Sequence, residues 1–208
     1  MARMSAEQRR ELLVQAAIVV MARDGVAHTT TRAIVAEADM QIGVFHYCFR
    51  SKEELVLEVM RTISTRAFEA VGEVLTQTSD PAELIERCIS AYWQHIEQDP
   101  LQHQLTYELT QYALRQPGQQ EAATAQYEHY ISSMKAFLDA AAEVGNFTWA
   151  TPVDVLARFV LANVEGITFQ WLVNRDSEMA HQLLVVLAAH LEREAGLSLG
   201  APSQQRRG

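Results

Sequence analysis

The sequence predicts an all-α protein of about nine helices, in which a small N-terminal three-helix domain precedes a larger helical domain. Apolar residues recur at helical spacing along most of the 208 residues. No segment shows the alternation of apolar and polar residues, bounded by turn residues, that indicates a strand. Proline, glycine and small polar residues stand where helices should begin and end. The composition, 49% apolar and 21% charged, is that of an ordinary globular protein.

The first helix is expected from about residue 5 to residue 24. Gly25 follows it, and glycine commonly ends helices because it adopts left-handed backbone without strain. The spacing of apolar residues predicts one face that packs into the core. This face is formed by Leu12, Leu13, Ala16, Ala17, Val20 and Met21.

Two short helices joined by a tight turn are expected within residues 30–47. Thr30 can cap the first of them, and Gln41 opens the second. Asp39 lies where the chain must reverse, and aspartate tolerates left-handed backbone better than most residues. A short helix held by a partner across a tight turn is what a helix-turn-helix offers to the major groove. This segment therefore predicts DNA binding.

The remaining helices are bounded by proline, glycine and serine. Ser51 is expected to cap the first of them and Ser177 the last, and three of the others open at a proline. The expected ranges are residues 52–78, 81–98, 100–116, 120–144, 152–175 and 178–195. Residues 201–208 are predicted to form a disordered tail.

The second short helix is expected to read DNA with its exposed side chains. Gln41 can pair with adenine, while Ile42 and Val44 can contact thymine methyl groups. Tyr47 and Lys52 are expected to hold phosphates, whereas the spacing of two phenylalanines suits the core. The predicted DNA-binding residues are Thr30, Arg32, Gln41, Ile42, Gly43, Val44, His46, Tyr47 and Lys52.

The same segment resembles the DNA-binding region of the TetR family of transcriptional regulators. The matches in register are Thr29, Thr30, Ile34, Ala38, Gly43, Phe49, Lys52 and Leu55. The departures are Asp39 for the turn glycine, Gln41 for the helix-opening serine, His46 for a tyrosine, and Cys48 for the histidine or tyrosine that follows. Tyr47 is expected to supply the phenol one place later. The departures leave the operator sequence open, while the expected fold is unchanged.

The resemblance implies a helix-turn-helix DNA-binding domain at residues 1–50 and a ligand-binding and dimerisation domain at residues 51–200. It further implies a homodimeric transcriptional regulator, a repressor that a small-molecule ligand releases from a palindromic operator. No cofactor, metal or enzymatic activity is expected, because no phosphate loop or nucleophile elbow appears and no two histidines are four residues apart. No apolar run approaches the roughly 20 residues needed to span a bilayer, which predicts a cytoplasmic protein.

The last two expected helices, residues 152–175 and 178–195, are apolar on nearly every side. A helix that is apolar all round is buried all round. We therefore expect these helices to pack on a second copy as half of a four-helix bundle, with an unusually well-buried monomer core as the alternative. A twofold dimer would hold two reading helices about 34–36 Å apart or more.

Polar and aromatic residues interrupt the apolar stretches of the larger domain. Buried polar groups are costly unless they are paired, so several of these residues are predicted to line a ligand pocket. The predicted ligand-binding residues are Tyr92, His95, Tyr107, Tyr127, Asn163, Glu165 and Phe169. Each is alternatively an ordinary core or surface residue, and the expected dimer interface competes for Asn163 and Glu165.

The charge distribution leaves a second reading open. Residues 1–62 carry eight Lys or Arg and eight Asp or Glu, so the net charge of −9 lies entirely in the rest of the chain. An acidic body disfavours non-specific binding to DNA and makes binding depend steeply on salt. Together with the departures at Asp39, Gln41 and His46, this balance favours the alternative of a helical ligand-binding or protein-interaction module whose helix-turn-helix is vestigial.

Overall fold

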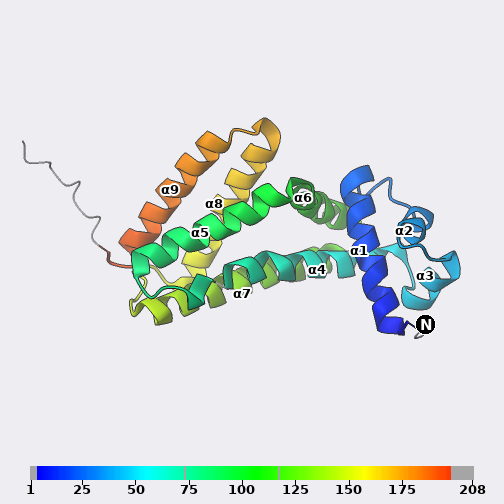
Figure 1. The fold of residues 1–208 in the computed structure, drawn as a ribbon, viewed down its shortest axis with the longest axis horizontal. Coiled ribbons are helices and arrows are strands. Elements are labelled where there is room, and N and C mark those ends of the chain that lie inside the picture. The colour runs from blue at the N-terminus through cyan, green and yellow to red at the C-terminus, as the bar shows by residue number, and fades with distance from the viewer. Residues whose placement is uncertain (1–3, 73, 117, 198–208) are drawn as a thin grey trace, which may run out of the picture. The chain divides into compact units, whose positions relative to one another are not determined.

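The computed structural model describes residues 4–72, 74–116 and 118–197, with backbone alone for residues 64–72, 76 and 122. Every regular element in these ranges is a helix, which confirms the all-α prediction (Figure 1). The chain divides into two compact units. Unit 1 is residues 1–67 and 96–129, and unit 2 is residues 68–95 and 130–208. The elements are α1 (Ala6–Asp24), α2 (Thr31–Glu37), α3 (Ile42–Cys48), α4 (Lys52–Gly72), the 3-10 helix η1 (Val74–Thr76), α5 (Pro81–Gln98), α6 (Pro100–Arg115), α7 (Gln120–Gly145), α8 (Val153–Asn174) and α9 (Ser177–Glu194).

Helix α1 begins and ends where local chemistry requires it. The Ser5 hydroxyl accepts a hydrogen bond from the Gln8 backbone N–H at 3.1 Å, and the Gln8 side chain accepts one from the Ser5 N–H at 2.8 Å. This reciprocal pair satisfies two amide groups that the helix itself cannot pair. Gly25 ends the helix with a φ of 84°, a conformation that glycine adopts at no steric cost.

The helix-turn-helix forms as predicted. Thr30 caps α2, with its hydroxyl accepting from the Ala33 N–H at 3.1 Å. Asp39 takes a φ of 52°, so an aspartate makes the left-handed turn between α2 and α3. Gln41 stands at the N-cap of α3, but its side chain makes no capping hydrogen bond. Helices α1, α2 and α3 contact one another, and they lie together in Figure 1.

The core of unit 1 holds this arrangement from behind. Phe45 and Phe49 are each 1% exposed, which confirms their predicted place in the core. They share one cluster with residues of α1, α2, α4 and α6, among them Leu13, Ile34, Leu55 and Leu109. Leu12 was predicted to belong to this core and is 43% exposed, so that prediction is wrong. The buried face of α1 is centred on Ala17 and extends to Val14 and Ile18, which places Leu12 beyond its edge.

Two helix boundaries differ from the prediction. Helix α4 ends at Gly72 rather than near residue 78, and the 3-10 helix η1 follows it. Glycine at a helix end explains the early stop. Helix α9 is capped by Asp176, whose carboxylate accepts from the Met179 N–H at 3.0 Å, so Ser177 is not its cap. The Ser177 hydroxyl instead accepts a hydrogen bond from the Trp171 indole at 2.9 Å.

Unit 2 has its own core, to which α5, α7, α8 and α9 contribute. Leu84, Leu138, Leu156 and Leu187 lie in it, one from each of these helices. Helices α8 and α9 contact each other directly. Both were predicted to be apolar on every side, and each buries one side in unit 2 while leaving large apolar side chains exposed on the other.

Some predictions fall outside what this structure tests. The predicted tail at residues 201–208 lies outside the described residues. The predicted domain boundary near residue 50 stays a prediction, because the compact units divide the chain differently and α4, α5 and α7 contribute residues to both. Within the described ranges, none of the helices is both long enough and apolar enough to cross a membrane.

Candidate functional site

One face of helix α3 is exposed to solvent, and its opposite side packs into the core of unit 1. Gln41, Ile42, Gly43, His46 and Tyr47 are exposed, and Tyr47 is the most open of the large side chains here at 69%. Val44 is half-buried. An ideal Cβ built on Gly43 would meet no atom within 4 Å, so the backbone itself is accessible at this point. A seven-residue helix with this exposed edge and a buried back has the form of a recognition helix.

The other predicted DNA contacts surround this helix in unit 1. Thr30 and Arg32, at the start of α2, are exposed. Lys52 differs from them, because its ammonium group donates a hydrogen bond to the Val26 carbonyl at 2.8 Å and is half-buried. Burial lowers the pKa of Lys52, and the nearby Glu53 partly opposes this shift. All nine predicted residues therefore lie in one unit, and Lys52 is in addition a structural contact.

A second group of contacts ties α6 to the segment between α1 and α2. The Glu108 carboxylate accepts a hydrogen bond from the Val26 N–H at 2.7 Å, and Lys52 bonds the carbonyl of the same residue. The Lys52 ammonium also lies 5.9 Å from the centre of the Tyr112 ring. The backbone N–H and the backbone carbonyl of Val26 are thus both hydrogen-bonded to side chains distant in sequence. Sequence reasoning missed Glu108, because nothing local marks a carboxylate that pairs with a loop 82 residues away.

Arg10 is a further residue that sequence reasoning did not place in this role. Its guanidinium donates to the Cys48 carbonyl at 2.7 Å, to Glu54 at 3.2 Å and to Glu58 at 3.1 Å. It also stacks over the Phe49 ring at 4.1 Å. The end of α3 and the start of α4 are therefore bound to α1 by one planar cation with several donors.

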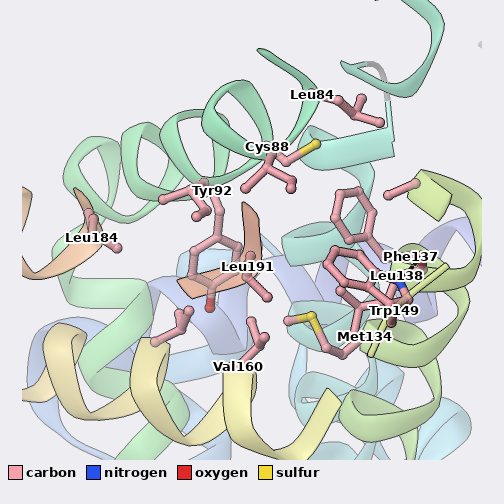
Figure 2. Close-up of a pocket in the computed structure, with 14 residues that line it drawn as sticks. Leu84, Cys88, Tyr92, Met134, Phe137, Leu138, Trp149, Val160, Leu184 and Leu191 are labelled. Carbon is pink, nitrogen blue, oxygen red and sulfur yellow. Dashed lines mark hydrogen bonds between the residues drawn. The ribbon is translucent and has the colours of Figure 1, made fainter. Parts of the chain in front are cut away.

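Unit 2 contains a cavity of about 60 Å³ between α5, α7, α8 and α9. Its walls are apolar and aromatic, and Figure 2 shows Phe137 and Trp149 apart from Tyr92 among the lining side chains. The Trp149 indole donates to the Leu138 carbonyl at 3.0 Å. The lining residues are Leu84, Ile85, Cys88, Ile89, Tyr92, Met134, Phe137, Leu138, Ala141, Trp149, Val160, Val164, Leu184 and Leu191.

The predicted ligand-binding residues are dispersed. Tyr92 is the one of the seven that lines the cavity. Asn163 and Phe169 lie on α8, where the Asn163 side-chain amide bonds the Phe159 carbonyl at 2.8 Å and Phe169 is 55% exposed. His95 and Glu165 belong to unit 2 without lining the cavity, and Tyr107 and Tyr127 belong to unit 1. The set as a whole stays a prediction.

The ligand-binding residues predicted from sequence are polar or aromatic, whereas most of the residues that line the cavity are aliphatic. A signal was present in α5, where Leu84, Cys88 and Tyr92 recur every four residues and share one helix face. In α7, Met134, Leu138 and Ala141 follow at intervals of four and three residues and also share one helix face. Such stripes identify a core but do not reveal that the core encloses a space.

The outer face of α8 carries a regular stripe. Val155, Phe159, Ala162, Gly166, Phe169 and Val173 follow one another at alternating intervals of four and three residues. The four large side chains in this stripe are between 41% and 74% exposed. A groove of about 360 Å³ between α8 and α9 adjoins it, lined by Phe159, Ala162 and Val186 among others. Alternating intervals of four and three are typical of a helix seam that packs on another helix.

This fold and the exposed α3 define a class, the helix-turn-helix DNA-binding regulators. Two sequence models identify the class further. The model of bacterial regulatory proteins of the tetR family matches residues 13–59. The model of the C-terminal part of BetI-type transcriptional repressors matches residues 81–196, more than half of the chain. The chain belongs to the TetR family of bacterial transcriptional regulators, which confirms the resemblance.

Similar proteins agree with this assignment. The nicotine-responsive transcriptional repressor HdnoR of Paenarthrobacter nicotinovorans is 26% identical over 193 residues, which cover 92% of this chain and 98% of that protein. The multidrug binding protein EbrR, solved with ethidium, is 26% identical at a TM-score of 0.65, covering 86% of this chain and 98% of the other. A TetR regulator from Haloarcula marismortui reaches a TM-score of 0.73 at 16% identity, covering 90% of this chain and 98% of that one, and supports the fold alone.

Membership of the TetR family supports the predicted class of function, though not the individual site residues. The protein is a DNA-binding transcriptional repressor with a ligand-binding C-terminal domain. Regulators of this family bind DNA operators and small molecules, form dimers and are not enzymes. The alternative of a module with vestigial DNA binding is not supported by these relatives.

Proposed function

We propose that the protein is a homodimeric repressor that a small molecule releases from a pseudo-palindromic operator. The observation that carries this proposal is the exposed face of α3, backed by the buried Phe45 and Phe49. A reading helix must expose its base-contacting side chains and still be held rigidly from behind. The cytoplasm, where the chromosome of a bacterium lies, is the expected place of action.

The proposed roles at the DNA follow from chemistry and exposure. Gln41 pairs with an adenine edge, and Ile42 and Val44 contact thymine methyl groups. Thr30, Arg32, Tyr47 and His46 hold the backbone or neighbouring base edges, and the accessible Gly43 allows close approach. Lys52 retains donors beyond its bond to Val26, so it can hold a phosphate while it supports the loop.

The dimer is proposed to form through α8 and α9. Val155, Phe169 and Val173 on α8, and Val185 and Val186 on α9, are all more than half exposed. A contiguous apolar surface of this kind is a typical protein–protein interface. Exposed Ala162 and half-buried Gly166 in the middle of the α8 stripe would let two α8 helices approach closely. Twofold pairing of this face would complete a four-helix bundle.

The cavity in unit 2 is the proposed site of the releasing ligand. The names of two relatives support a small-molecule ligand, because HdnoR is described as nicotine-responsive and EbrR was solved with ethidium. The ligand would release the repressor by binding better to the form whose reading helices have the wrong spacing for the operator. It can shift this equilibrium only by its difference in affinity for the two forms.

The test is a selection from random DNA duplexes by the purified protein at about 50 mM salt, where phosphate contacts are strong. The expected result is an inverted repeat with half-sites about one helical turn apart or somewhat more. The matched control is the protein with Tyr47→Ala, which keeps the fold and should enrich the motif less. Light scattering at micromolar concentration should give a dimeric mass.

If the selection enriches no motif, there are two possible explanations, and a second experiment distinguishes them. Protein that carries a bound ligand from expression would be held in its released form. Unfolding, removal of small molecules and refolding would then restore enrichment. Absence of a motif after this treatment, or a monomeric mass, would contradict the proposal.

A further inference from the structure

Helix α3 is short and depends on its neighbours for its position. It has seven residues, with Phe45 buried at its back. An isolated helix of this length is not stable in water. Apolar packing is not directional, so it limits the tilt and rotation of a short helix less than hydrogen bonds do. A directed polar contact at one end of α3 would therefore fix the face that it presents.

Arg10 of α1 supplies such a contact. We propose that Arg10 is a positioning residue for DNA reading, which fixes the orientation of α3 toward the major groove and does not itself contact DNA. That the protein has a specific operator to read rests on the proposed function. The hold of Arg10 on α3 rests on the contacts within unit 1 alone.

The first of these contacts involves a carbonyl at the end of the reading helix. Cys48 is the last residue of α3, and the last carbonyls of a helix have no partner within it. The Arg10 guanidinium donates a hydrogen bond to the Cys48 carbonyl at 2.7 Å. The partial negative charge at a helix C-terminus also favours a cation there. This bond joins the end of α3 to α1.

The same guanidinium is held by two carboxylates of α4. Its two terminal nitrogens lie 3.2 Å from Glu54 and 3.1 Å from Glu58. Glu54 also accepts a hydrogen bond from the Arg50 N–H at 2.9 Å, so it joins the cation to the segment between α3 and α4. A carbonyl and two carboxylates need donors in several fixed directions. The planar guanidinium has them, whereas the ammonium of a lysine is a compact point charge.

These contacts leave Arg10 poorly suited to bind DNA directly. Its side chain is 34% exposed, whereas that of Arg23 on the same helix is 57% exposed. Its guanidinium lies 4.1 Å from the centre of the Phe49 ring, and Phe49 is in the core of unit 1. A phosphate would have to displace two carboxylates that already compensate the charge. Arg10 therefore acts on DNA through α3.

The test compares binding of the selected operator with binding of an unrelated duplex of the same length, by fluorescence anisotropy. Arg10→Met removes every donor, and the unbranched thioether can still pack on the Phe49 ring. The carboxylates left without a cation would weaken binding of both duplexes alike. The ratio of the two affinities therefore isolates the effect on reading. We expect this ratio to fall about 10-fold, the effect of misaligning one base contact.

Two further variants serve as controls, and circular dichroism checks that each variant is folded. Arg10→Lys keeps the charge but not the directed donors, so its ratio should lie between those of the native protein and Arg10→Met. Arg87→Met makes the same change in net charge on α5 of unit 2, where Arg87 is 48% exposed, and should leave the ratio unaltered.

Two results would overturn the inference. Equal weakening of both duplexes in Arg10→Met would mean that Arg10 acts as a phosphate contact or through its charge alone. Unaltered affinity for both duplexes, in a variant that is folded but less stable, would mean that the contacts of Arg10 only stabilise unit 1.

Amide hydrogen exchange in the free protein distinguishes this inference from the proposed function. In Arg10→Met the amides of α3 should exchange about 10-fold faster, because hydrogen bonds that hold the helix are lost, while those of α9 keep their native rates. If α3 exchanges faster but the native protein selects no operator, the hold of Arg10 on α3 stands and the proposed function fails. If exchange in α3 is unchanged, the inference fails whether or not an operator is found.

Discussion

Unit 1 and unit 2 are both helical and both contain polar contacts between residues far apart in sequence, such as the Thr151 N–H with the Glu194 carboxylate in unit 2, but they differ in what they leave open. In unit 1, side chains far apart in sequence form specific polar contacts, such as Glu108 with the Val26 N–H and Arg10 with the Cys48 carbonyl. In unit 2, the interior keeps a cavity, and α8 exposes an apolar stripe. Polar contacts have preferred directions and fix positions, whereas apolar packing tolerates rearrangement. Unit 1 thus suits rigid presentation of α3, and unit 2 suits partners that complete it.

The largest expected effect is on the apolar face of unit 2. Val186→Glu places a carboxylate on the proposed interface, at a position that is 65% exposed in the single chain. In a twofold dimer two such charges would be buried without partners, at a cost of several kcal/mol. We expect a monomeric mass in light scattering at micromolar concentration.

The matched control for this prediction is Val19→Glu, on α1, at a position that is 49% exposed. It introduces the same charge on unit 1 and should leave the protein dimeric. A dimeric mass for Val186→Glu would remove the contrast between an open apolar face in unit 2 and a self-contained unit 1.

The next effect tests whether polar contacts hold unit 1 together. Glu108→Leu leaves the Val26 N–H without its acceptor, which lies 2.7 Å away in the native protein. An unsatisfied buried donor costs about 1–3 kcal/mol. We expect a loss of this size in the free energy of unfolding, measured by urea denaturation. Glu108→Gln retains an acceptor oxygen and should lose distinctly less, and equal losses in the two variants would mean that the hydrogen bond is not what stabilises this loop.

A smaller effect is expected on DNA binding itself. Tyr47→Ala removes the most exposed large side chain of α3, and the loss of one polar contact to the backbone should weaken operator binding about 5- to 10-fold. Fluorescence anisotropy with the selected operator measures this change. Because Tyr47 contributes nothing to the core, thermal stability and dimeric mass should stay as in the native protein. Unaltered affinity would show that α3 presents another edge to DNA.

The smallest effect is a pH dependence at the junction of α3 and α4. The Arg50 N–H donates to the Glu54 carboxylate at 2.9 Å and, with a further contribution from Arg10, lowers the pKa of Glu54 from its ordinary value of 4.5. A carboxylate with a lowered pKa stabilises the fold above pH 4.5, and this contribution disappears as the pH falls through the lowered pKa. The difference in melting temperature between the native protein and Glu54→Gln should therefore shrink below pH 4.5. A difference that stays constant with pH would exclude this role.

Local signals determined most of the helical framework. Pro81 and Pro100 open α5 and α6 where the sequence predicts, because proline fixes the first turn and lacks the N–H that would be unpaired there. Asp39 and Thr30 were identified as turn and cap residues for reasons confined to a few neighbouring residues. The reading helix also lies where the sequence motif places it, since the motif consists of such local signals.

Tertiary structure decided the rest. Leu12 was predicted to lie in the core, yet the face of α1 that packing buries is centred on Ala17 and leaves Leu12 beyond its edge. Asp176 and Ser177 are both residue types that can cap α9. Asp176 is the cap, because the Ser177 hydroxyl accepts a hydrogen bond from the Trp171 indole of α8 instead. Tyr92 lines the cavity while His95, three residues on, does not, because a cavity is the space that four helices fail to fill together. Periodicity specifies which side of a helix is apolar, but only the packing of helices against each other specifies which part of that side meets a partner and which part meets empty space.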